Sequence, residues 1–409
     1  MLLTRSILRT LALALVAAAC TSAQTTSTTE SPPTTLVSAT SSSSTTTQAP
    51  PTTLEVTLPT VVPAEPEPDP PAPPPDLPSG VTGVAVAAVG GAEVAESLGG
   101  EPFVRAHQGL VFPVVGRAGH WLQVETQCET RAWINGDQVA FTPGAREINS
   151  TGAGFDFRTA VVVLDPGHGG PNTGAVGPAG TVEKDLNLDI ARRTRDLLGT
   201  SHAVDWETGA ILTGSSVPPV GTVWMTRTEG PPGADIETGL VFRATLANAA
   251  GAHALVSIHN NTSPDTQSEI TGAEAYYRVM DSESKRLGGL IVEELRRGFG
   301  SFNVEWATAL DAGAKYRVRS DGVTDLYGVL KDAQVPAVLV EGAYLSNPAE
   351  EQLLQTPEFR QAYADAIYRA LVRFLSTDDP GSGFVEPINR TASPGSGSPQ
   401  PKCTIPAQP

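Results

Sequence analysis

The sequence has few basic residues, and they form no cluster. Its 409 residues include 27 Lys and Arg against 44 Asp and Glu, which gives a formal net charge of −17. Proteins that bind nucleic acids neutralise phosphates with clustered Lys and Arg. The composition therefore excludes a nucleic-acid-binding surface as the basis of function.

A long apolar run is also missing at the N-terminus. The apolar segment Leu11–Ala19 follows a basic start but is much shorter than the roughly 20 residues that a transmembrane helix needs. Small residues then lead to Cys20, so residues 1–20 are predicted to be a signal peptide. The stretch VAAAC resembles a bacterial lipoprotein cleavage site, although Ala17 stands where Leu is more usual. Two outcomes stay open: lipidation of Cys20, which would anchor the chain to a membrane, or ordinary signal-peptidase cleavage nearby.

Cysteine is scarce, with three residues in the whole chain. If Cys20 carries a lipid, Cys128 and Cys403 remain. An exported protein meets an oxidising environment, in which these two residues could form a disulfide. Their positions in the sequence do not establish the pairing.

Two segments lack the apolar residues that a core requires. Residues 21–79 begin with Ser and Thr, become Pro-rich and contain no Lys or Arg, so we expect a disordered tether with a stiff, extended second half. Behind a lipidated Cys20 this tether would hold the folded part away from the membrane; otherwise it is a spacer. Residues 377–409 return to Gly, Ser and Pro and are predicted to be a disordered tail.

Residues 80–145 show the pattern of a small all-β domain. Short apolar stretches alternate with turn residues, as in Leu110–Val115, Trp121–Val124 and Ala132–Ile134. The order FPVVGRAGHWLQV…AWI resembles the bacterial SH3-like domains that are attached to cell-wall hydrolases. Such domains bind wall peptides or pack on the enzyme. Trp121 and Trp133 could accordingly line a peptide groove or belong to the core.

Residues 158–376 alternate apolar strands with helical stretches. Strands separated by helices predict a three-layer α/β domain whose largely parallel central sheet is flanked by helices. The expected strands are Val161–Leu164, Thr222–Met225, Ala254–Ile258, Ala273–Arg278 and Ala337–Val340, and the expected helices are Glu183–Leu198, Ile236–Ala250, Ser282–Phe299 and Pro357–Leu375.

A polar side chain follows each of three apolar strands. His168 comes after VVVL, His259 after ALVSI, and Glu341 after AVLV. Active sites of open α/β sheets form beyond the carboxyl ends of the strands. Imidazole and carboxylate are the ligands that zinc prefers when Cys is absent, and a catalytic zinc needs three of them. Glu183, which opens a helix after the glycine-rich loop Gly169–Gly180, fits as the third ligand and leaves Glu341 as general base.

Each of these residues also has a structural interpretation when taken alone. A His after a strand is often a structural hydrogen-bonding residue. His253 lies just before its strand, at the opposite edge of the sheet from the site, and is expected to be structural. An acid such as Glu183 is favoured at a helix start by the helix dipole, and Glu341 could be a buried salt-bridge partner. Their convergence at one sheet edge favours a site.

Several motifs in this region carry a family resemblance. LDPGHGG, VEKDLNL, MTR, RATLAN, LVSIH and VPAVLVEGAYLSNPAEEQLL occur in the order and spacing of one family. From Val161 to Leu375 the chain resembles the zinc-dependent N-acetylmuramoyl-L-alanine amidases of the type-3 class. The resemblance implies that His168, Glu183 and His259 bind Zn²⁺ and that Glu341 is the catalytic acid/base.

The resemblance also implies the substrate, which is the amide bond between N-acetylmuramic acid and L-alanine in peptidoglycan. This bond is cut during cell-wall remodelling or cell separation.

The chain departs from the family pattern in SIHNN, where SIHAN is commoner, and in the long segment Ser201–Gly221. Two other functions stay open: a zinc peptidase that acts on wall stem peptides, and a non-catalytic cell-wall-binding protein. The oligomeric state is not set by the sequence.

Overall fold

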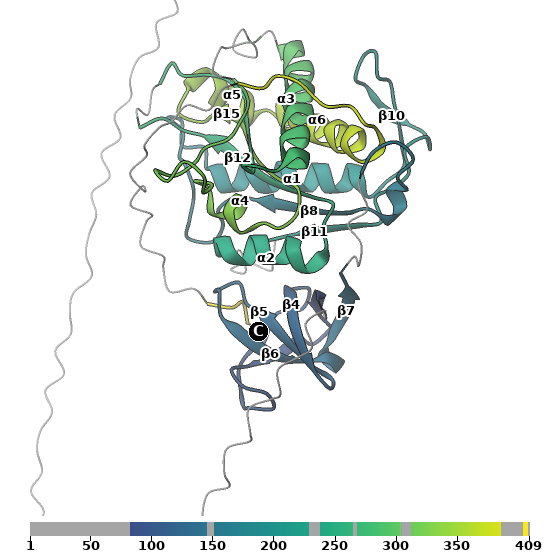
Figure 1. Cartoon of the computed structure of the whole chain (residues 1–409). Helices are drawn as coiled ribbons and strands as arrows, with labels where there is room; N and C mark the ends of the chain where they lie inside the picture. Colours follow the sequence, from purple (N-terminus) through teal and green to yellow (C-terminus); the bar gives the residue numbers. More distant parts are fainter. Residues whose placement is uncertain are drawn as a thin grey trace, which may run out of the picture. The chain divides into compact units, whose positions relative to one another are not determined.

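The computed structural model describes residues 82–144, 151–228, 238–264, 268–302, 304, 312–385 and 404–407. The signal peptide, Cys20 and the tether lie outside these residues, as does Cys403. Within the described ranges, no helix is long and apolar enough to cross a membrane. The described elements make up an all-β domain and an α/β domain (Figure 1).

The β domain is a seven-stranded antiparallel sheet in the order β3-β2-β6-β5-β4-β1-β7. Its strands are β1 Gly83–Ala87, β2 Ala92–Ala95, β3 Pro102–Ala106, β4 Val111–Ala118, β5 Trp121–Glu125, β6 Arg131–Asn135 and β7 Val139–Pro143, with a short 3-10 helix at Gly136–Gln138. This confirms the all-β prediction, whereas the SH3-like identity stays a prediction. Trp133 is buried, and Trp121 is half-buried.

A short C-terminal segment lies against the β domain. His107 N donates to Pro406 O at 2.8 Å, and Ala407 forms a bridge with Ala106 at the end of β3. Ile405 is 9% exposed and belongs to the apolar core of the β domain. Part of the predicted tail is therefore an ordered neighbour of edge strand β3.

The α/β domain has a six-stranded sheet in the order β11-β8-β12-β15-β13-β14. The strands are β8 Val161–Pro166, β11 Thr222–Met225, β12 Ala254–Asn261, β13 Glu274–Tyr277, β14 Gly313–Lys315 and β15 Ala337–Tyr344. The first four strands in this order are mutually parallel. Strand β13 runs antiparallel to β15, and β14 runs parallel to β13. The largely parallel sheet that the sequence predicts is confirmed.

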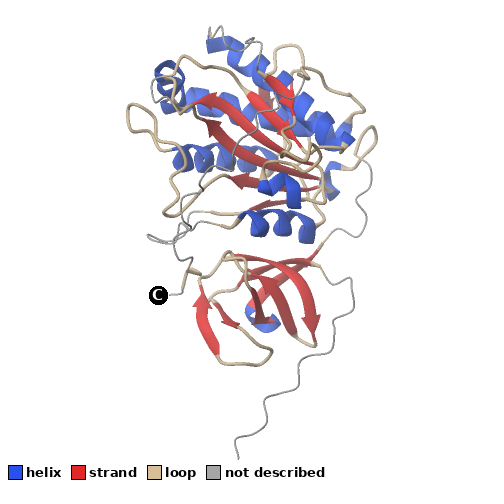
Figure 2. Ribbon diagram, turned by 60° about the vertical axis from the view of Figure 1, so that its left-hand side comes forward, coloured by secondary structure: helices blue, strands red, loops and turns tan. Residues whose placement is uncertain are grey.

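Helices cover both faces of this sheet, as Figure 2 shows. Alternate residues of β8 divide between two cores: Val162 and Leu164 pack with α1, α3, α5 and α6, while Val163 packs with α2 and α4. The helices are α1 Glu183–Leu198, α2 Leu240–Ala250, α3 Ser282–Phe299, α4 Gly328–Asp332, α5 Pro348–Gln355 and α6 Pro357–Ser376, with short 3-10 helices at Phe157–Thr159 and Gly300–Phe302. The domain thus has the three layers that the sequence predicts.

The segment Ser201–Gly221 contains a two-stranded hairpin of β9 His202–Val204 and β10 Ile211–Thr213. The buried guanidinium of Arg369 on α6 donates to Gly209 O at 2.9 Å and fixes the loop of the hairpin. Arg297 on α3 donates to Trp206 O at 2.6 Å. These contacts place the hairpin beside α3 and α6.

Candidate metal centre

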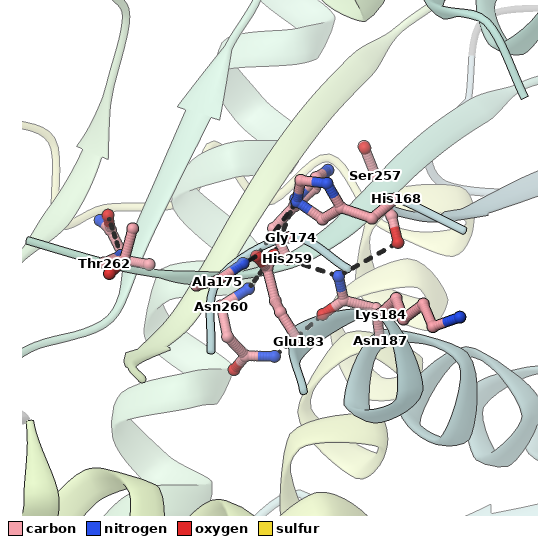
Figure 3. A network of polar contacts seen from close by, with 12 residues as sticks. His168, Gly174, Ala175, Glu183, Lys184, Asn187, Ser257, His259, Asn260 and Thr262 are labelled. Atoms are coloured by element: carbon pink, nitrogen blue, oxygen red, sulfur yellow. Dashed lines mark hydrogen bonds and ion pairs between the residues drawn. The ribbon is translucent and has the colours of Figure 1, made fainter. Parts of the chain in front are cut away.

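Three side chains from different parts of the fold converge at the carboxyl ends of β8 and β12 (Figure 3): His168 follows β8, His259 lies near the end of β12, and Glu183 opens α1. His168 Nε2 lies 3.1 Å from Glu183 Oε2, and His259 Nδ1 lies 3.1 Å from Glu183 Oε1. The possible ligand atoms of the three residues all lie within 4.8 Å of one another. Two imidazoles and one carboxylate at this spacing form a group that can hold a metal ion.

The loop between His168 and Glu183 folds back so that Glu183 faces both histidines. Glu183 N donates to Ala175 O at 3.0 Å, and Ala175 N in turn donates to Glu183 Oε2 at 2.8 Å. Gly174 has a φ of +67°, and a Cβ atom there would lie 2.4 Å from Glu183 Oε2. A glycine is therefore required at this position for the carboxylate to reach the histidines.

Glu183 is ionised despite its burial. It is 3% exposed, and burial by itself would raise the pKa of its carboxyl. The hydrogen bonds and charges of His168 and His259 outweigh that effect and hold the pKa of Glu183 below its ordinary value. Asn260 N and Asn187 Nδ2 also donate to Glu183 Oε1, each at 3.2 Å. The Glu183 carboxylate is thus negatively charged and fixed in position, as a ligand of a cation has to be.

Glu341 lines the same cavity as the three candidate ligands. It stands directly opposite His259 in the parallel pairing of β12 and β15. Burial, with the negative charges of Glu183 and Glu274, raises the pKa of Glu341 well above its ordinary value, and Arg317 opposes the shift. Its Oε2 atom is buried and has no hydrogen-bond partner within the described part of the chain. A buried carboxyl with one oxygen free is suited to exchanging a proton with a bound molecule.

The cavity over this site has a volume of about 490 Å³. Polar residues form one part of its lining, among them Asn172, Asn261 and Thr262, and apolar residues such as Leu240 and Val329 form another. Among the described residues that line it, none comes from the β9–β10 hairpin. The hairpin is therefore a surface feature and does not form a wall of the cavity.

Comparison with known proteins assigns the α/β domain to a protein family. Residues 162–373 match the family described as N-acetylmuramoyl-L-alanine amidase, and this range covers nearly all of the α/β domain. The chain belongs to that family. Its enzymes hydrolyse amide bonds, so this chain is an amidase.

Two relatives agree with this assignment by sequence. The germination-specific N-acetylmuramoyl-L-alanine amidase of Bacillus subtilis is 32% identical over 219 residues, which make up 53% of this chain and 80% of that protein. The amidase AmiC of Neisseria meningitidis is 29% identical over 256 residues, and the match spans 55% of each protein. A crystal structure of an N-acetylmuramoyl-L-alanine amidase from Clostridium difficile is 26% identical with a TM-score of 0.41, over 53% of this chain and 97% of that chain.

The structure brings all four residues that the sequence singled out to one place in the amidase domain. His253 lies elsewhere, where its Nδ1 accepts a hydrogen bond from Val161 N at 3.0 Å. Sequence reasoning missed the residues that support the site, such as Asn187 and Tyr363. Asn187 bridges Glu183, the Gly167 carbonyl and Asn260. Tyr363 Oη donates to His259 O at 3.1 Å.

Asn187 lies inside the motif VEKDLNL, so the motif could have indicated a role for it. Tyr363 lies on α6, outside the motifs, and no sequence pattern pointed to it.

Proposed function

We propose that this chain is a zinc-dependent amidase that hydrolyses the bond between the lactyl group of N-acetylmuramic acid and L-alanine in peptidoglycan. The observation that carries the proposal is the group of His168, Glu183 and His259 with Glu341 in the same cavity. Membership of the amidase family supports the reaction, and the donor atoms support the metal.

The donor set fits zinc. Two imidazole nitrogens and one carboxylate oxygen are a donor set typical of catalytic zinc sites, so His168, Glu183 and His259 would hold the ion. His168 Nδ1 lies 3.0 Å from Asn172 Oδ1, which leaves Nε2 facing Glu183 and the metal position. When bound, zinc supplies Lewis acidity that lowers the pKa of water and polarises a carbonyl group.

Glu341 is the acid/base of this proposal. Its free Oε2 accepts a proton from the attacking water, and the same carboxyl then delivers that proton to the departing nitrogen of L-alanine. Burial and the negative charges of Glu183 and Glu274 raise the pKa of Glu341, which makes its carboxylate form a stronger base for taking the proton from water. Water is consumed, the carbonyl carbon gains a hydroxyl oxygen, and the leaving amine gains the proton.

The test is to incubate the zinc-loaded protein with purified muropeptides and weigh the products. We expect free stem peptides with an unblocked L-alanine amine, lost when a chelator is present. Shortened stem peptides still attached to sugar would instead identify a peptidase. No products despite bound zinc would favour a wall-binding protein.

The Glu341→Gln variant tests the assigned role. It should bind zinc as the wild type does and lose turnover by about 10²- to 10⁴-fold, the usual contribution of a general acid/base. Glu350→Gln is the matched control, because Glu350 is another buried carboxyl of this region but does not line the cavity. Wild-type turnover in Glu341→Gln would refute the role.

We further propose that the amidase acts in the cell envelope, exported by residues 1–20 and anchored through a lipid on Cys20. The family supports action on the cell wall, and the motif VAAAC supports the anchor. Mass spectrometry of the mature protein should find a diacylglyceryl group on Cys20, and Cys20→Ser should release the protein from membranes. An unmodified N-terminus in the wild type would rule out the anchor.

A further inference from the structure

Three consecutive carbonyl groups next to the metal centre accept hydrogen bonds from two buried arginines. They belong to Pro166, Gly167 and His168, where the chain leaves the end of β8. Buried carbonyls without partners are costly, so such a turn needs donors. The donors are Arg227, which follows β11, and Arg243 on α2, and each is 3% exposed.

Arg227 joins the segments that carry two of the candidate ligands. Its Nε donates to Pro166 O at 2.9 Å, and its Nη2 donates to Gly167 O at 3.0 Å. The same Nη2 donates to Lys184 O at 2.7 Å. Lys184 follows Glu183 directly, so one guanidinium fixes the turn before His168 relative to the first residues of α1.

Arg243 holds the backbone of His168 itself. Its Nη2 donates to His168 O at 2.8 Å, and its Nη1 donates to Pro166 O at 3.0 Å. His168 has a φ of +62°. This left-handed conformation costs a residue with a side chain about 1–2 kcal/mol and persists only where the surroundings impose it. The bond from Arg243 is one such constraint on the residue.

A buried carboxylate extends this arrangement to the third ligand. Asp165, fully buried, pairs with Arg243 and accepts hydrogen bonds from Thr226 Oγ1 and Ser257 Oγ at 2.6 Å each. Ser257 lies two residues before His259 on β12. The Asp165 carboxylate therefore connects the ends of β8, β11 and β12, and with them the two strands that lead to histidine ligands.

We propose that Arg227 and Arg243 are positioning residues of the metal centre, which set the backbone of His168 and the start of α1 so that the three ligands meet one ion. The proposal rests on the proposed function for the identity of that ion. It assigns a role to the motifs MTR and RATLAN, which contain these arginines. Only the planar, multiply donating guanidinium reaches several carbonyls at once, and a lysine cannot replace it.

A matched residue separates positioning from general stability. Arg369 is also 3% exposed and buried in an ion pair, with Nε 2.7 Å from Glu294 Oε2 and Nη1 2.9 Å from Gly209 O. Its acceptors lie on α3 and the β9–β10 hairpin rather than on the ligand segments. Arg369→Lys removes a comparable set of hydrogen bonds at a distance from the metal.

The experiment measures zinc affinity by competition with a chelator for the wild type, Arg227→Lys, Arg243→Lys and Arg369→Lys, together with the thermal stability of each metal-free protein. We expect the two site variants to bind zinc about 10- to 100-fold more weakly, as loss of residues that orient metal ligands usually does. Arg369→Lys should lose stability but keep its zinc affinity. The visible spectrum of the Co²⁺-loaded proteins, which reports ligand geometry, should change only in the site variants.

Equal zinc affinities and equal Co²⁺ spectra across the variants would overturn the proposal and assign the arginines to stability alone. A wild type that binds no zinc would instead refute the proposed function, so the two failures are distinguishable. Should a lysine variant not fold, Ser257→Ala removes a single hydrogen bond to Asp165 and tests the same arrangement, with weaker zinc binding expected and unchanged binding contradicting it.

Discussion

At the scale of single residues, Gly174 shows how a missing side chain makes room for the metal centre. A Cβ atom at this position would lie 2.4 Å from Glu183 Oε2 and 2.6 Å from His168 Cδ2. Real Cβ contacts are essentially never so short, so the side chains of both candidate ligands would have to move away from position 174. The residue combines a positive φ with a close approach, and only glycine satisfies both.

Gly174→Ala should therefore weaken zinc binding about 10- to 100-fold, the range found when the surroundings of metal ligands are disturbed. Gly180→Ala is the control, because Gly180 lies in the same loop with a φ of +88°, but a Cβ atom there would meet nothing within 4 Å. Both variants carry a backbone strain of about 1–2 kcal/mol. Competition with a chelator gives the zinc affinity of both variants, and the difference between them isolates the contact of the Cβ atom at position 174 with the candidate ligands. Equal affinities would contradict this account.

The four candidate site residues were predictable because three of them lie where apolar runs of the sequence end. His259 and Glu341 directly follow the runs ALVSI and AVLV, and His168 comes shortly after VVVL. In the structure, β12 and β15 continue through His259 and Glu341, and the carboxyl ends of these parallel strands meet at one edge of the sheet. Arg227 and Arg243 were not assigned a role, although their motifs stood out. A bond from a side chain to a distant carbonyl depends on the tertiary fold and leaves no periodic pattern in the sequence.

At the scale of elements, the boundaries of helices with strong hydrophobic periodicity were predicted well. Helices α1 and α3 have the expected bounds, since their apolar residues recur at helical spacing over many turns. The antiparallel direction of β13, the short strand β14 and the hairpin β9–β10 were not predicted. Short strands have few alternating positions, and their direction is set by the partner strand rather than by their own residues.

The first turn of helix α5 carries a buried carboxyl, Glu350, that makes the stability of the fold depend on pH. Glu350 is fully buried and accepts hydrogen bonds from Tyr344 N and Gly272 N, which closes the turn between β15 and α5. Burial outweighs these hydrogen bonds and raises the pKa of Glu350 from 4.5 to about 8. The folded state therefore holds a proton that the unfolded state releases between these pH values.

From this shift we expect the contribution of Glu350 to stability to be complete below pH 4.5 and to be lost as the pH rises to about 8. The loss is on the order of a few kcal/mol. Glu350→Gln, which cannot ionise, should lack this component. Denaturant unfolding of both proteins at several pH values gives the difference, and a gap between them that stayed constant with pH would disprove the raised pKa.

At the scale of the whole molecule, the C-terminal segment links the end of the chain to the β domain. Cys128 is disulfide-bonded. A cavity of the β domain is lined by Cys128 together with Thr404 and Ile405. Since Cys403 directly precedes Thr404 in the sequence, we expect Cys403 to be the partner of Cys128, while Cys20 stays available for a lipid.

Cys403→Ser should then expose a free thiol at Cys128 and lower the stability of the β domain by about 2–4 kcal/mol, the usual effect of losing a disulfide. Cys20→Ser should leave the bond intact. Alkylation before and after reduction, followed by peptide mapping, identifies the partner, and a cross-linked peptide containing Cys20 would contradict the pairing. Because such a bond persists only in oxidising compartments, a Cys128–Cys403 disulfide in the native protein would support export independently of the N-terminal sequence.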